Sequence, residues 1–213
     1  MNRTFLAPLV VVLCAFSADA GAQTAPTPST PPAALPGLSL PALPAAPLLT
    51  EFSAADRDKV MLLLSGFHGI GTRQEFEAAT PQARRLLEAI ARDSSVGALH
   101  QNRALAALSY WNDAGVEALF VNLLNTPTTS EMNRHRLIGF LARTFGERAL
   151  TWVERYLTDA DLQFRLTAVE AIASIATPAA LNLLQQALVI EKDAFVQQRL
   201  RLVTATPVVS PAP

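Results

Sequence analysis

Cysteine and histidine are scarce in this chain of 213 residues. The single cysteine, Cys14, cannot form an intramolecular disulfide, and a zinc site built from several thiolates is excluded. The three histidines stand alone, without a second histidine three or four positions away to complete a metal-binding helix face: His68, His100 and His135. We interpret the first as a turn residue and the last as a solvated or capping side chain. The sequence therefore predicts neither a metal site nor a cofactor.

Motifs for catalysis and nucleic-acid binding are missing as well. The glycine-rich stretch 66–71 lacks the lysine and the preceding strand of a phosphate-binding loop, and no serine stands in a nucleophile elbow. Asp159 and Asp161 form a close acidic pair, but Asp161 or Thr158 is better explained as the N-cap of a helix that begins near Leu162. The formal net charge is −1 with both signs spread along the chain, which argues against a basic nucleic-acid face. We predict no catalytic residue and no nucleic-acid partner.

The N-terminus has the pattern of an export signal. Residues 1–22 carry Arg3, then an apolar run from Phe5 to Phe16 that is too short to span a bilayer comfortably, then small residues suited to cleavage before Gly21 or Gln23. The alternative is an uncleaved N-terminal anchor. We expect a periplasmic or secreted protein whose mature form has no membrane span.

Residues 23–50 form a second segment of unusual composition, rich in proline and alanine and without charge. Recurrent proline removes backbone donors and fixes φ, so neither helix nor sheet can propagate. We predict a disordered, partly polyproline-II linker that serves as a spacer; the alternative is a ligand for a proline-binding groove. A folded domain over 51–205 and a frayed tail over 206–213 complete the predicted organisation.

The domain is predicted to be all helical, with marked helix starts. Thr72 and Glu75 form a capping box, and Ser53 with Asp56 resembles one. Thr80-Pro81 and Thr177-Pro178 each provide an N-cap hydroxyl followed by proline at the first helical position. The expected helices are 53–66, 73–79, 81–93, 98–111, 114–125, 131–145, 147–157, 161–175, 178–189 and 191–203.

Six of these helices form three similar hairpins. Three arginines recur at intervals of 31 residues, and so do three leucines: Arg103, Arg134 and Arg165, then Leu119, Leu150 and Leu181. One hairpin cannot bury its apolar face alone, so neighbouring hairpins must stack. The outer helices, including a last one with a polar face, would cap the stack.

The repeat resembles HEAT-like repeats of the short bacterial kind, which are also found in phycobilin lyases. The resemblance covers about 98–203 and is best where Arg165, Ala168 and Ile172 fit an Arg-x-x-Ala-x-x-x-Leu pattern. It implies an all-α, α-α superhelical solenoid in which the repeated arginines are structural. Tetratricopeptide repeats are the competing solenoid, but their period of about 34 residues and their signature are missing.

The function that we expect is binding of a protein partner, which the sequence does not identify, by a monomeric scaffold without catalysis. In stacked hairpins the second helices usually line the recognition face. Trp152 and Arg155 would form an anchor pair there, because these residue types are enriched at binding hot spots, and Gln186 and Glu117 would lie beside them. The alternatives are an enzyme subunit resembling the phycobilin lyases and a structural component of the bacterial envelope.

Overall fold

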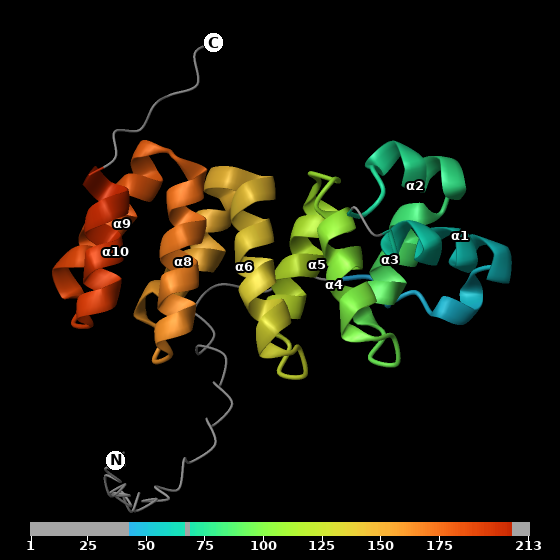
Figure 1. The fold of residues 1–213 in the computed structure, drawn as a ribbon, viewed down its shortest axis with the longest axis horizontal. Coiled ribbons are helices and arrows are strands. Elements are labelled where there is room, and N and C mark those ends of the chain that lie inside the picture. Colours follow the sequence, from blue (N-terminus) through green and yellow to red (C-terminus); the bar gives the residue numbers. More distant parts are fainter. Residues whose placement is uncertain (1–42, 67–68, 206–213) are drawn as a thin grey trace, which may run out of the picture.

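The structure, a computed structural model, describes residues 43–66 and 69–205, and within these ranges every regular element is a helix (Figure 1). The predicted export signal, most of the linker, His68 and the tail lie outside the described residues. No described helix is long and apolar enough to cross a membrane. The elements follow one another along a single elongated row.

The N-terminal part contains a short 3-10 turn and three helices: η1 (Leu49–Glu51), α1 (Ala54–Leu64), α2 (Arg73–Ala79) and α3 (Ala83–Arg92). The predicted capping box on α2 is confirmed, since Thr72 Oγ1 accepts from the Glu75 amide at 3.3 Å and Glu75 Oε2 accepts from the Thr72 amide at 2.7 Å. Ser53 caps α1 by accepting from the Asp56 amide.

The predicted start of α3 at Thr80-Pro81 is wrong. Thr80 is buried, and its carbonyl oxygen accepts from the Ala83 amide at 3.1 Å, so Pro81 belongs to a turn and the helix begins at Ala83. The turn is stabilised further because Thr80 Oγ1 accepts from the Gln82 amide. The threonine thus anchors a tight turn here, two residues earlier than a helix N-cap would stand.

The three predicted hairpins and a closing helix follow. Their elements are α4 (Ala98–Leu108), α5 (Ala114–Asn125), α6 (Glu131–Phe145), η2 (Gly146–Ala149), α7 (Leu150–Val153), η3 (Glu154–Thr158), α8 (Leu162–Ile175), α9 (Pro178–Ile190) and α10 (Ala194–Ala205). Asp113, Asp161 and Thr177 cap α5, α8 and α9 through their side-chain oxygens. The first helices α4, α6, α8 and α10 stand side by side, each in contact with the next (Figure 1).

Two predicted helices differ from the structure. The first helix of the first hairpin ends at Leu108, three residues before the predicted end, and buried Trp111 follows it in the turn. The single helix predicted over 147–157 is instead one short α-helical turn between two 3-10 segments. The first 3-10 segment begins directly at Gly146, the C-cap of α6 with a positive φ of 58°, and no capping side chain precedes it. Without such a cap, the first amides of an α-helix have no side-chain acceptor.

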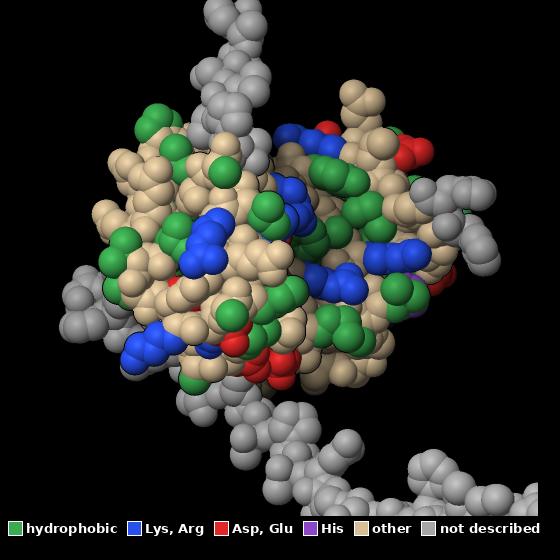
Figure 2. All heavy atoms as spheres, turned by 60° about the vertical axis from the view of Figure 1, so that its left-hand side comes forward, with side chains coloured by type: hydrophobic (Ala, Val, Ile, Leu, Met, Phe, Trp, Pro, Cys, Tyr) green, Lys and Arg blue, Asp and Glu red, His purple; other side chains and the backbone are tan. Residues whose placement is uncertain are grey.

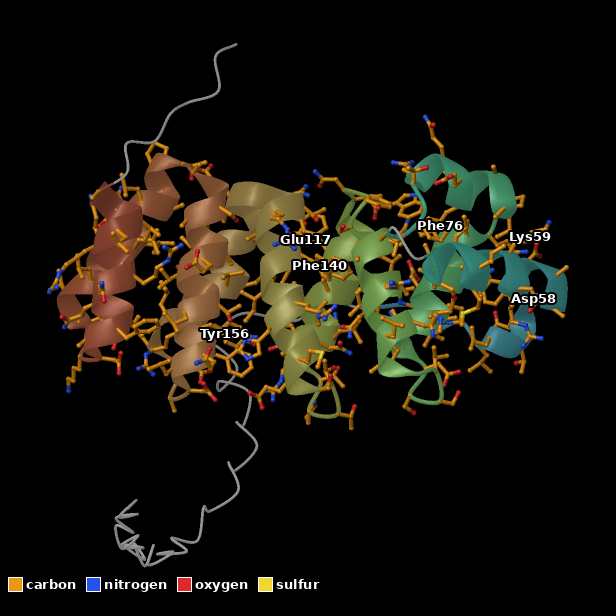
Figure 3. The ribbon with its side chains drawn as sticks, viewed as in Figure 1. Asp58, Lys59, Phe76, Glu117, Phe140 and Tyr156 are labelled. Atoms are coloured by element: carbon orange, nitrogen blue, oxygen red, sulfur yellow. The ribbon has the colours of Figure 1, made fainter. Side chains whose placement is uncertain are left out.

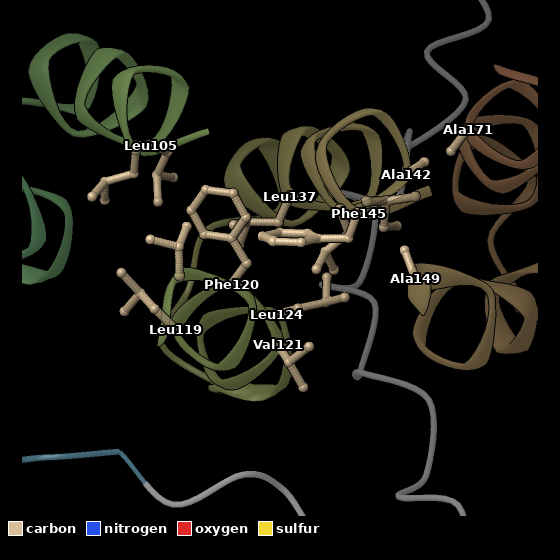
Figure 4. Packing of buried hydrophobic residues seen from close by; sticks show 14 of the residues in the cluster. Leu105, Leu119, Phe120, Val121, Leu124, Leu137, Ala142, Phe145, Ala149 and Ala171 are labelled. Carbon is tan, nitrogen blue, oxygen red and sulfur yellow. The ribbon is translucent and has the colours of Figure 1, made fainter. Parts of the chain in front are cut away.

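Buried side chains form one continuous cluster along the stack. Between α4, α5 and α6, Leu105, Phe120, Leu137 and Phe145 converge (Figure 4). The rings of Phe120 and Phe145 meet edge to face, with centroids 6.3 Å apart. Neighbouring hairpins therefore supply each other with the apolar surface that none of them could bury alone.

The closing helix α10 is not entirely polar on its outer side. Val196 and Leu200 face the stack and are buried, but Phe195 and Leu202 are exposed, together with Val189 and Ile190 at the end of α9. The expected polar residues Lys192, Gln198 and Arg201 are exposed as well.

Candidate functional site

The repeated arginines bind to the turns and side chains of neighbouring elements. Arg103 Nη1 donates to the carbonyl oxygens of Leu64 at 2.6 Å and Gly66 at 3.1 Å, which joins α4 to the end of α1. The guanidinium of buried Arg134 lies 5.3 Å from the ring centroid of Phe164 on α8.

Arg165 makes the most extensive contacts of the three. Its Nη1 donates to the carbonyl oxygens of Asp159 and Ala160, and its Nε pairs with Glu191 Oε2 at 3.0 Å. It thereby connects the loop before α8 to the loop after α9. The repeated leucines differ more in their burial: Leu119 and Leu150 are buried, whereas Leu181 is partly exposed.

The predicted anchor pair lies largely inside the stack. Trp152 is half-buried and packs against the core. Arg155 Nη2 donates to Asn125 Oδ1 at 2.7 Å and to Tyr156 Oη at 3.1 Å, and the guanidinium lies 5.0 Å from the Tyr156 ring centroid. Tyr156 is fully buried, and this burial raises the pKa of its hydroxyl (Figure 3). In this structure Arg155 joins two elements of the stack.

The other two predicted partner residues lie on separate helices. Glu117 on α5 pairs with Arg148 at 3.5 Å, and Gln186 is exposed on α9. Among the described residues no hydrogen bond or ion pair links Trp152, Arg155, Gln186 and Glu117 to one another. The assignment of these four residues to a partner-binding surface stays a prediction.

A groove of about 520 Å³ opens instead between two first helices, α6 and α8, and we call it the α6–α8 groove. Its lining residues are His135, Arg136, Gly139, Phe140, Arg143, Thr167, Glu170, Ala171 and Ser174. Figure 2, which brings the C-terminal end forward, shows a hollow with hydrophobic side chains inside and Lys or Arg side chains around it. Gly139 and Ala171 carry little or no side chain, which leaves room between the two helices.

The charges at the α6–α8 groove are unbalanced. Within the described part of the chain, neither Arg136 nor Arg143 forms an ion pair with a carboxylate, and both are exposed. Glu170, the only acidic lining residue, already binds Arg199 through two hydrogen bonds, one of them 2.6 Å long. This contact raises the pKa of the Arg199 guanidinium. Two positive charges therefore remain for a ligand.

An aromatic ring accompanies these charges. The Arg143 guanidinium lies 5.4 Å from the ring centroid of Phe140, within range of a cation–π contact. Phe140 is labelled in Figure 3. A Cβ added to Gly139 would stand 3.2 Å from Arg143 Nη1. The absence of a side chain at Gly139 therefore lets the Arg143 side chain lie against the backbone of its own helix. The groove thus offers cations around a partly buried aromatic surface.

His135 also lines the groove, and its environment corrects the interpretation of a solvated or capping side chain. The ring stacks on Phe164 with centroids 4.0 Å apart, and Nδ1 is 2.8 Å from Thr167 Oγ1. These contacts fix the orientation of the imidazole between α6 and α8. Among the described residues, no group of three His, Cys, Asp or Glu side chains could hold a metal ion.

The comparison with protein families agrees with this architecture. Residues 120–203 match the family described as HEAT repeats, over α5 to α10. The chain is a HEAT-like repeat protein. No curated protein and no solved structure matches it. HEAT repeats form helical scaffolds that commonly mediate protein interactions, so this HEAT-like protein is a helical repeat scaffold.

One signal for the α6–α8 groove is already present in the sequence, although none of the predicted partner-binding residues lies there. Arg136, Phe140 and Arg143 are spaced four and seven residues apart, which places them on one face of a helix. We instead expected recognition on the second helices, as in most helical repeats.

Proposed function

We propose that this HEAT-like protein is an exported scaffold that binds a protein partner in the bacterial envelope and has no catalytic activity. The observation that carries the proposal is the α6–α8 groove, with two arginines beside Phe140 that form no ion pair with a carboxylate among the described residues. The signal-peptide pattern of residues 1–22 supports the location.

The chemistry of the groove favours an acidic partner segment. Arg guanidinium groups bind carboxylates in a planar, bidentate geometry, and an aromatic surface accepts an apolar side chain beside them. The partner segment would therefore carry two or more Asp or Glu residues flanking a hydrophobic one. Exposed cations also steer an acidic partner, so association should weaken as ionic strength rises.

A direct binding experiment tests this proposal. A fluorescent peptide with four Glu residues around one Leu is titrated with the purified protein, and fluorescence anisotropy is followed. We expect saturable binding that the double variant R136A/R143A weakens at least ten-fold. The matched control K192A/R201A removes two exposed cations elsewhere and should bind like the natural protein. Equal affinity of both variants, or of a peptide with Gln in place of Glu, would refute the acidic-segment proposal.

Cell fractionation tests the location separately. The protein should be found in the periplasmic or secreted fraction, with an N-terminus at Gly21 or Gln23. Recovery from the cytoplasm alone, with residues 1–22 still attached, would overturn the export proposal without affecting the binding experiment.

A further inference from the structure

A second groove lies between the α3–α4 and α5–α6 loops and differs in chemistry from the first. It has a volume of about 670 Å³, and we call it the α4–α6 groove. Its apolar lining residues include the partly buried Leu123 of α5 and, beneath the surface, the buried Leu105 of α4 and Leu137 of α6. Arg92 is the only charged residue among its described lining residues, and most of the others are small or neutral and polar.

The chain itself enters this groove. Leu43, where the described part of the chain begins, lines the groove and packs against the core. From there residues 43–48 run without regular secondary structure to η1 (Figure 1), where Glu51 binds Arg85 at 3.1 Å. The anchored η1 turn and the packed Leu43 therefore hold the start of the described chain at the groove.

Two buried polar atoms among the lining residues lack a partner. Asn133 Oδ1 and Arg92 Nε have no hydrogen-bond partner among the described residues. Burial also lowers the pKa of the Arg92 guanidinium, although the negative charge of Glu88 opposes this effect. Buried polar atoms in native proteins are nearly always hydrogen-bonded, so an acceptor for Arg92 and a donor for Asn133 must come from elsewhere. An extended peptide presents both, as its backbone C=O and N–H groups.

We propose that residues 36–42 of the linker bind in the α4–α6 groove as an intramolecular peptide ligand. Their sequence is Pro-Gly-Leu-Ser-Leu-Pro-Ala, which is uncharged and matches the mostly neutral lining of the groove. In polyproline-II geometry seven residues span about 22 Å, enough to extend from Leu43 across a groove of this volume. Leu38 and Leu40 would supply the apolar side chains, and the amides of residues 38–40 would supply donors.

Such binding gives the proline-rich segment a role beyond that of a spacer. A segment joined directly to the folded domain is present at high effective concentration, so even a weak contact stays largely formed. The linker would then occupy the α4–α6 groove and exclude other extended, neutral peptides. This inference does not rest on the proposed function, because none of the residues lining the two grooves is shared.

Hydrogen exchange of the purified full-length chain, measured at single-residue resolution, tests the proposal. The amides of Leu38, Ser39 and Leu40 should exchange at least ten-fold more slowly than those of Thr27, Ser29 and Thr30, after correction for intrinsic rates. The variant L38D/L40D should lose this protection. The matched control T27D/S29D adds the same charge outside the docking segment and should keep it. The groove variant N133A should reduce protection at 38–40.

Three outcomes would overturn the proposal. Exchange of residues 38–40 at the rate of residues 27–30 would mean that water or a separate partner fills the groove. Protection that depends on protein concentration would assign the groove to a second copy of the chain. Unchanged protection in N133A, with far-UV circular dichroism showing an intact fold, would place the linker elsewhere on the surface.

Discussion

Replacement of Arg165 by alanine should destabilise the domain substantially. The side chain is 15% exposed and its partner Glu191 is 8% exposed, so the ion pair is largely withdrawn from water. The variant would lose this pair and two hydrogen bonds to the carbonyl oxygens of Asp159 and Ala160. It would also leave the Glu191 carboxylate without its cation between α8 and α10.

The size of the effect follows from what remains after the substitution. Removal of one partner from a buried ion pair costs about 3–5 kcal/mol. Glu191 Oε1 still accepts from the amides of Lys192 and Asp193, both at 2.8 Å, which keeps part of the carboxylate solvated by the protein. We therefore expect the free energy of unfolding to fall by about 2–3 kcal/mol, at or below the lower end of the range for a buried ion pair. For a domain of this size the melting temperature should fall by about 5–10 °C.

Urea denaturation followed by far-UV circular dichroism measures this loss, with Arg199→Ala as the control. Arg199 and Glu170 also form an ion pair, but their side chains are 41% and 51% exposed. Such exposed pairs contribute about 0–1 kcal/mol. If Arg165→Ala lost no more stability than Arg199→Ala, the structural role of the repeated arginine would be refuted. Lost partner binding with an unchanged melt would instead assign Arg165 to recognition.

Three further predictions concern single residues. Ala176→Gly should raise the free energy of unfolding by about 0.5–1 kcal/mol in urea titrations, because Ala176 adopts a left-handed conformation with φ of 54° that favours glycine; no gain would argue against this conformation. Since burial raises the pKa of Tyr156 above 10.0, folding stability should fall as pH rises past 10.0, where the unfolded chain ionises first, and Tyr156→Phe should reduce this dependence. Trp152→Ala should lower the free energy of unfolding by about 2 kcal/mol, which is less than the loss expected for a fully buried tryptophan. The affinity for the acidic peptide should not change. If a stable Trp152→Ala variant lost this binding, Trp152 would be an anchor residue for the partner after all.

Much of the fold could be predicted because its signals are local. The hydroxyl of Thr177, the carboxylates of Glu75 and Asp161, and Pro178 each fix a helix start within one turn of their own position. The interval between the arginines indicated the stack itself. The segment after Gly146 was harder, because apolar spacing there is compatible with an α-helix although no N-cap side chain precedes it. At Thr80-Pro81 a capping signal is present but no helix begins there. Threonine followed by proline is compatible with a turn as well as with a helix N-cap.

The candidate site depends on pairings that a single sequence does not contain. Gly139 of α6 and Ala171 of α8 both line the α6–α8 groove, and its positive charge remains because Arg199, 29 residues after Glu170, binds that carboxylate. Arg155 shows the converse case. Its residue type suggested a hot spot, but Asn125, 30 residues earlier, holds it within the stack. Residue type and spacing indicate a helix face, whereas the tertiary contacts decide which charges remain available.

Helix α6 lines both grooves, but with different residues, so the two grooves differ in charge. Asn133 and Leu137 face the α4–α6 groove, while Arg136, Phe140 and Arg143 face the α6–α8 groove. A neutral linker segment carries no carboxylate to pair with the two arginines of the α6–α8 groove, so an acidic segment should bind there more tightly than the linker. An acidic segment would lose its hydration in the α4–α6 groove, where Arg92 is the only cation among the described lining residues to compensate for this loss. The linker can therefore remain bound while the α6–α8 groove stays open to a partner, and the two binding events need not exclude each other.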